Sequence, residues 1–143
     1  MRSFVGIASI AVALLALTVA GTLTGAFAQG TQVVGTYEGN VARRLVRGET
    51  RETRIYRLTM NDDQNTGKVW VFELEGRKLR NEMGFVVRRM ADLTYEGETR
   101  PIKTTPGYIP DKIKLTFARD GRSVTWYHND GTTEGSGTLQ RAP

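Results

Sequence analysis

Apolar and polar residues alternate along most of the chain after residue 32, which is the period expected of β-strands with one buried face. The alternation is clearest at 51–60, 112–118 and 123–128. In the first of these runs Tyr56, Leu58 and Met60 share one face. Weaker alternation predicts further strands at 33–45, 68–75, 79–90, 93–96 and 132–141. The pattern therefore predicts about eight strands and no helix in this part of the chain.

Short turn sequences separate most of these runs. Asp120-Gly121 and Asn129-Asp130-Gly131 are hairpin signals, because asparagine, aspartate and glycine tolerate the positive φ of tight turns. The segment 99–110 differs, since it holds three of the four prolines of the chain. Proline cannot donate to a strand ladder, so we expect a long loop or a covered edge there.

Short, sequential turns favour one fold class. We predict an all-β domain that forms a single antiparallel up-and-down β-barrel of about eight strands, because closure removes both unpaired edges of a meander. A two-sheet β-sandwich is the alternative, since its strands would show the same pattern. A barrel of this size holds either a packed interior or one small ligand.

Large aromatic residues are expected to face the interior. On the strand 68–75 we assign the inner face to Trp70, Phe72 and Leu74 rather than to Val69 and Val71. In a packed barrel such residues form the core, and in a ligand-binding barrel some of them line a pocket. The candidate ligand-binding residues are Tyr56, Trp70, Phe72, Phe85, Phe117 and Trp126.

Residues 1–28 have the order of a secretory signal peptide. Arg2 precedes an almost wholly apolar run, and Ala26-Phe27-Ala28 supplies the small residues of a cleavage site. An uncleaved N-terminal membrane anchor is the alternative, because the uncharged stretch is long enough to span a bilayer. We expect a signal helix at 1–28 and one β-barrel domain at 29–143, in a protein that is exported to the periplasm or secreted.

Composition adds two limits. The chain has no cysteine, so an exported domain would have to be stable without disulfides. The formal net charge is +5, with arginines mixed among acidic residues rather than gathered in a tail. This pattern does not indicate a nucleic-acid partner, whereas an anionic envelope surface or an acidic protein partner is compatible with it.

Residues at the two ends of the barrel region resemble a known family. Gly35-Thr36-Tyr37 opens the first expected strand, and Arg141 ends the last. This arrangement resembles the calycin group of small barrels, including lipocalin-like domains, where a Gly-x-Trp sequence and a basic residue pack across the barrel base. Tyr37 stands where that family usually has tryptophan. The resemblance implies an apolar cavity open at one end, with Tyr37 and Arg141 in structural roles.

Arginines crowd the first expected hairpin, with Glu49 and Glu52 between them. Such a cluster can hold phosphate or carboxylate groups. The alternative is a charged exterior that discourages edge pairing. The candidate anion-binding patch comprises Arg43, Arg44, Arg47, Arg51, Arg54 and Arg57.

No constellation for catalysis or metal binding stands out. His128 is the only histidine, and one histidine without converging carboxylates does not make a common zinc site. The loop at 61–67 lacks the ligand spacing of a calcium loop, so we interpret it as a polar turn. Glu73 and Glu75 share a strand face, which we assign to solvent rather than to glycoside hydrolysis. We therefore expect no cofactor, no metal and no enzymatic activity.

The leading hypothesis is an exported, non-enzymatic protein that binds a small hydrophobic or amphipathic molecule in a lipocalin-like barrel. The arginine cluster would meet the acidic end of that ligand or an anionic surface. The alternative is an envelope module with a packed core that docks on a protein or a cell-wall polymer.

Overall fold

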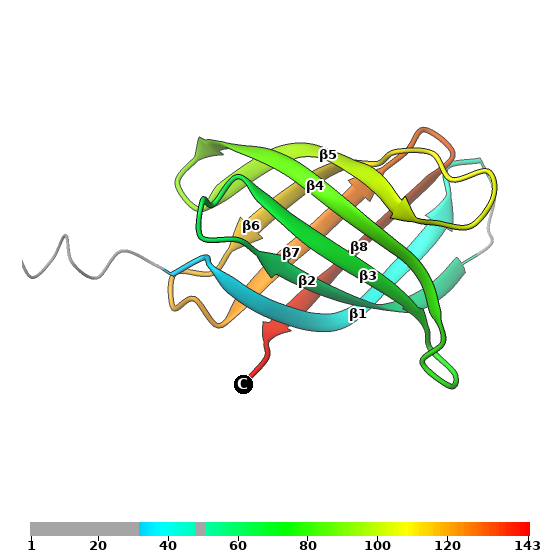
Figure 1. Ribbon diagram of the computed structural model, residues 1–143, viewed down its shortest axis with the longest axis horizontal. Helices are drawn as coiled ribbons and strands as arrows, with labels where there is room; N and C mark the ends of the chain where they lie inside the picture. The colour runs from blue at the N-terminus through cyan, green and yellow to red at the C-terminus, as the bar shows by residue number, and fades with distance from the viewer. Residues whose placement is uncertain (1–31, 48–50) are drawn as a thin grey trace, which may run out of the picture. The chain divides into compact units, whose positions relative to one another are not determined.

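The computed structural model describes residues 32–47 and 51–143, which form one closed barrel of eight antiparallel strands (Figure 1). Each strand pairs with the next, and β8 closes on β1. The predicted up-and-down barrel is confirmed and the sandwich is wrong. The strands are β1 (Gly35–Leu45), β2 (Arg51–Met60), β3 (Thr66–Glu73), β4 (Leu79–Ala91), β5 (Thr94–Lys103), β6 (Lys112–Phe117), β7 (Ser123–Asn129) and β8 (Thr133–Arg141).

The predicted signal segment 1–28 and its cleavage boundary lie outside the described residues. Within the described ranges, no helix is long and apolar enough to cross a membrane.

Alternate residues of every strand turn into a single apolar core. Four of the six predicted aromatic residues belong to this core, and each is at most 3 % exposed. The rings of Tyr37 and Phe117 lie edge-on, as aromatic pairs prefer, with 5.6 Å between their centroids. The four are Tyr56, Phe85, Phe117 and Trp126.

The predicted face of β3 is wrong. Val69 and Val71 enter the core, whereas Trp70 and Phe72 lie on the outer wall. Both faces of this strand are apolar, so its hydrophobic pattern does not fix which one is buried. On the outer wall the Phe72 ring is covered by the guanidinium groups of Arg57 and Arg77, at 5.9 and 6.0 Å from its centroid.

An irregularity at the start of β4 moves two residues away from the sides that strict alternation would give them. Asn81 pairs with Val71 but Leu79 pairs with Phe72, so Arg80 is an extra residue between two pairs. Leu79, which strict alternation would place on the same face as Met83 and Phe85, is therefore 38 % exposed. The bulge brings Arg80 to the open end of the barrel, where Asn81 also lies by its regular alternation with Met83.

The proline-rich segment is partly strand. β5 continues to Lys103, although we expected a loop or covered edge from residue 99. Beyond Glu98 this strand has ladder partners on β4 but none on β6, because β6 begins only at Lys112. Pro101 thus lies in a half-strand with one unpaired side, beside a register shift, where proline is tolerated.

The end of the barrel where β1 begins is closed by Arg141. Its guanidinium lies 4.8 Å from the centroid of the Tyr37 ring and donates to the Tyr37 hydroxyl at 2.7 Å. It also donates to the backbone carbonyls of Gln32, Val34 and Gly121 at 2.5, 2.9 and 2.6 Å. Tyr37 and Arg141 therefore pack across the barrel base as the family resemblance implies.

Gly35 makes this closure possible. Its φ is +140°, which residues with a side chain rarely adopt. A Cβ at this position would also collide with the Arg141 guanidinium. Glycine is thus required where the first strand passes beneath Arg141.

Candidate functional site: the polar mouth of the barrel

The opposite end of the barrel holds a cavity of about 270 Å³, which we call the mouth. The cavity that the resemblance implies is apolar, whereas charged and hydroxyl side chains line much of the mouth. They come from strands β1, β2 and β4 on one side and from the loops after β5 and β7 on the other. The main polar lining residues are Arg43, Arg54, Tyr56, Arg80, Asn81, Thr105, Tyr108, Asp111, Asp130 and Thr133.

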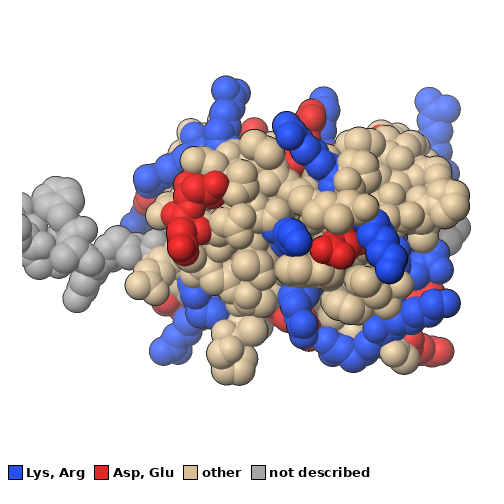
Figure 2. Space-filling model, in the orientation of Figure 1, with Lys and Arg blue, Asp and Glu red and all other residues tan. Residues whose placement is uncertain are grey.

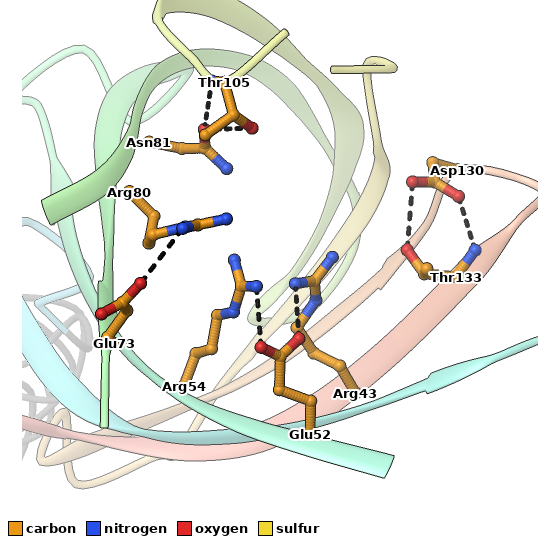
Figure 3. Close-up of polar contacts among 9 residues, drawn as sticks. All are labelled: Arg43, Glu52, Arg54, Glu73, Arg80, Asn81, Thr105, Asp130 and Thr133. Atoms are coloured by element: carbon orange, nitrogen blue, oxygen red, sulfur yellow. Dashed lines mark hydrogen bonds and ion pairs between the residues drawn. The ribbon is translucent and has the colours of Figure 1, made fainter. Parts of the chain in front are cut away.

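Three arginines converge on the mouth (Figure 3). Arg43 and Arg54 share one carboxylate, that of Glu52, at 3.4 and 2.7 Å. Arg80 pairs with Glu73 at 3.1 Å. The side chains of both glutamates are between a third and a half exposed, so water competes for these pairs and each adds little stability.

The protein does not fully satisfy these three cations. The Nε atoms of Arg43, Arg54 and Arg80 are buried and have no hydrogen-bond partner in the described part of the chain. Buried polar atoms are nearly always hydrogen-bonded, and each exception calls for an explanation. Three exceptions of one kind in one cavity indicate that its lining lacks acceptors for the positive charge.

Asn81 adds a fourth donor. Its Oδ1 accepts from the backbone N–H of Thr105 at 2.9 Å and from the Thr105 hydroxyl at 3.4 Å. With the oxygen fixed in this way, the amide NH₂ faces the arginines across the mouth (Figure 3). The β1–β4 side of the mouth therefore presents donors.

Asp111 lies on the other side of the mouth, at the end of the β5–β6 loop. Its backbone is fixed, because its N–H donates to Thr99 Oγ1 at 2.8 Å and its carbonyl accepts from the Thr99 N–H at 2.9 Å. The residue is 8 % exposed, and burial raises the pKa of its carboxyl to about 7, with Asp130 adding to the shift and Arg43 opposing it. Among the residues that the structure describes, its carboxyl oxygens have no hydrogen-bonded partner.

Asp130 has a different role. Its carboxylate accepts from the backbone N–H groups of Thr132 and Thr133 and from the Thr133 hydroxyl, at 2.6 to 3.0 Å. These hydrogen bonds hold the pKa of Asp130 below its usual value although burial opposes them. Asp130 thus shapes the β7–β8 turn and has few lone pairs left for a ligand.

His128 lies in the core beside this cavity. Its ring stacks on Tyr56 with 5.7 Å between centroids, and its Nδ1 accepts from the Trp126 indole N–H at 2.7 Å. Burial, together with the positive charge of Arg43, lowers the pKa of His128 to about 4. The histidine is therefore neutral at pH 7. A Cβ on Gly135 would come within 3.0 Å of its Nε2, so glycine there makes room for the ring.

The structure brings together two of the six predicted patch arginines. Arg43 and Arg54 enter the mouth, while Arg44 and Arg57 form ion pairs on the outer wall with Glu134 and Glu38. Arg47 and Arg51 are exposed. The face seen in Figure 2 shows acidic and basic groups interspersed, as expected of a solvated mixed-charge surface.

Sequence reasoning missed Arg80, Asn81 and Asp111. Arg54 had a usable signal, because it falls on the same alternating face as Tyr56. Arg80 had none, since the bulge that positions it interrupts the alternation.

The candidate metal ligands do not gather. The described residues hold no group of three or more histidine, cysteine, aspartate or glutamate side chains able to bind a metal ion. Asp63 instead accepts hydrogen bonds from Asn65 and Thr66, which makes the 61–67 loop a polar turn.

Comparison with known proteins gave no match: no family model fits the chain, and no curated protein or solved structure is significantly similar to it. The site itself must therefore carry any functional argument. Its converging guanidinium groups suit an anion, because their planar forks match carboxylate and phosphate oxygens.

Proposed function

We propose that the protein is a non-enzymatic binder of a small anionic molecule, or of the acidic end of an amphipathic one, in the mouth of the barrel. The observation that carries this proposal is the set of three arginines whose Nε atoms are buried without partners in the described chain. An incoming carboxylate or phosphate supplies the acceptors that the lining lacks.

The half-exposed glutamates make the exchange feasible. Glu52 and Glu73 can turn toward water when the anion arrives, because an ion pair at such exposure contributes at most about 1 kcal/mol. Membership of the calycin group is part of the proposal, and the Tyr37–Arg141 contact supports it. Export to the periplasm or the cell exterior is a further part, supported by the signal-like sequence at 1–28.

The test is calorimetric titration with inorganic phosphate. We expect Arg54→Gln to weaken binding about tenfold or more, since a hydrogen bond to a charged group contributes about 1.5–3 kcal/mol. Glu52→Gln should tighten binding, because it removes the competing carboxylate.

The matched control is Arg57→Gln, which changes an arginine of the same strand that faces the outer wall. Equal losses in Arg54→Gln and Arg57→Gln would show that phosphate binds by net charge alone, and the proposal would fail.

A second candidate is a docking module with a packed interior. It is favoured by the continuous apolar core and by a groove of about 350 Å³ on the outer wall of β4–β7, where Met90 and Tyr127 are 49 and 39 % exposed. Native mass spectrometry of the protein from the exported fraction of its host separates the two. A co-purifying small molecule supports the binder, and a bare chain or a multiple of it favours the module.

A further inference from the structure

The mouth is chemically two-sided. Its cations come from β1, β2 and β4, whereas Asp111 stands just before β6. In a closed barrel of eight strands in sequential order, β6 lies across the interior from β2. A ligand that reaches the arginines can therefore extend toward a buried carboxyl on the opposite wall.

From this arrangement, which rests on the proposed function, we infer that the ligand is an anion carrying its own hydrogen-bond donor, such as a small hydroxy acid or amino acid. Its acidic group faces Arg43, Arg54 and Arg80, and its hydroxyl or ammonium group donates to the carboxyl of Asp111. The ligand thus supplies acceptors on one side of the mouth and a donor on the other.

The two sides differ in what they lack. The arginines have Nε donors without acceptors, and no group of the described chain donates a hydrogen bond to the Asp111 carboxyl. A plain anion would complete only the first side and would bring a like charge toward Asp111. A specific site built to bond a donor rejects the analogue that lacks it, because a buried polar group is then left unpaired.

The size of the mouth sets a limit. A volume of about 270 Å³ accommodates a molecule of roughly ten non-hydrogen atoms, if about 30 Å³ is allowed for each water-sized group. Four-carbon acids fall in this range, so three compounds with one skeleton serve as probes. Succinate has no donor, malate has a hydroxyl, and aspartate has an ammonium group.

Several charged and titratable groups face Asp111 and belong in any account of pH. They are Arg43 on β1, Tyr56 on β2, Tyr108 in the same loop and Asp130 in the β7–β8 turn, while Arg54 lines the same cavity and His128 packs against Tyr56. Burial raises the pKa of both phenols, and the pKa of His128 is lowered to about 4. Asp111 is therefore the group among them that changes charge between pH 6 and pH 8.

The experiment is calorimetric titration of the full domain with the three acids at pH 6 and pH 8. At pH 8 we expect malate or aspartate to bind at least tenfold more tightly than succinate, with a smaller ratio at pH 6. Preference for malate identifies the hydroxyl as the donor, and preference for aspartate identifies the ammonium.

Two variants make the test specific to Asp111. Asp111→Ala should bring the three affinities within about twofold of one another while succinate binding is retained. Asp111→Asn keeps an acceptor oxygen without the charge, so it should abolish a preference for aspartate but only reduce one for malate. Circular dichroism confirms that each variant is folded.

The failures are distinguishable. If all three acids bind wild-type protein equally and Arg54→Gln weakens each of them, the anion site stands and the donor inference is overturned. If phosphate binds but none of the three acids does, the donor inference is again overturned. If neither phosphate nor any acid binds, the proposed function itself fails.

Discussion

Arginine closes one end of this barrel and lines the other, and the two environments are opposite in kind. At the closed end, Arg141 donates to three backbone carbonyls and a phenol, and its charge rests on the Tyr37 ring. At the mouth, Arg43, Arg54 and Arg80 rely on half-exposed glutamates and keep buried Nε atoms unpaired within the described chain.

This difference distinguishes an arginine that stabilises the fold, Arg141, from the mouth arginines, which remain available to bind a ligand. The partners of Arg141 are neutral groups held in place by the fold, namely three backbone carbonyls and the Tyr37 hydroxyl. The partners of the mouth arginines are mobile carboxylates that a stronger acceptor can displace. Functional sites often keep such unoptimised groups at some expense in stability.

The largest effect should come from Arg141→Gln. The change leaves the carbonyls of Gln32, Val34 and Gly121 without their donors and removes the cation from the Tyr37 ring. We expect the free energy of unfolding to fall by about 4 kcal/mol, since the half-buried guanidinium donates four hydrogen bonds that each contribute about 1 kcal/mol. Urea denaturation measures this.

Arg44→Gln on the outer wall is the control and should change stability by less than about 1 kcal/mol. Similar losses in both variants would remove the distinction between the closed end and the surface.

An effect of similar size, but dependent on pH, is expected for Asp111→Asn. The pKa of this carboxyl is about 7 in the folded protein and near 3.8 in the unfolded chain, so between these values only the folded state holds the proton. Wild-type stability therefore falls as the pH rises through this window, and the penalty is complete above pH 7.

Asp111→Asn removes that penalty. The variant should match wild type near pH 4 and exceed it by roughly 4 kcal/mol at pH 8, at about 1.4 kcal/mol for each pKa unit between the folded and unfolded values. Urea denaturation at both values measures the difference. A gain that is the same at pH 4 and pH 8 would show that the carboxyl is not buried in solution.

Arg54→Leu should change stability least among the arginine variants. The residue lines the mouth, and Glu52 retains Arg43 as a partner. We expect a change within about 1 kcal/mol, toward greater stability, because an apolar group replaces an incompletely bonded cation. Thermal denaturation of Arg54→Leu and Arg141→Gln under the same conditions compares the two changes in stability. A loss of about 4 kcal/mol in both would mean that the mouth arginines are structural as well.

His128 provides a spectroscopic test with no mutation. Its pKa is about 4, so its ring signals in nuclear magnetic resonance should stay constant from pH 8 to about pH 5.5 and move only below that. As the only histidine, it needs no assignment. The unfolded chain takes up the proton first, at its usual pKa of 6.5, so stability is lost as pH falls between these values. A titration midpoint near pH 6.5 would instead show that the His128 ring is exposed to water.

The fold was predictable because the strongest strands show one apolar face and the turns between them are short. β6 and β7 alternate without a break, and their buried residues are those the pattern indicates. β3 was not predictable in the same way. Val69 and Val71 compete with Trp70 and Phe72 for the core, and the decision depends on Arg57 and Arg77, which come from other parts of the chain.

The site was predictable only in part. The density of arginines in the first hairpin pointed to the right elements, and period-two alternation separates Arg54 from Arg57. Arg80 is brought in by a bulge, and Asp111 is brought in by a loop that crosses the barrel end. Both depend on how the closed barrel places distant segments, which no local pattern encodes.

The two ends of the described domain are fastened at the same pole. Gln32 accepts from Arg141, and the backbone N–H of Ala142 donates to the carbonyl of Thr36 at 2.8 Å. The β5–β6 and β7–β8 loops, whose residues line the mouth, lie at the other pole (Figure 1). A sensor surface, a fluorescent fusion or a purification matrix attached at either end of the described domain, at Gln32 or Pro143, would therefore leave the cavity facing solution, which suits this barrel to oriented immobilisation.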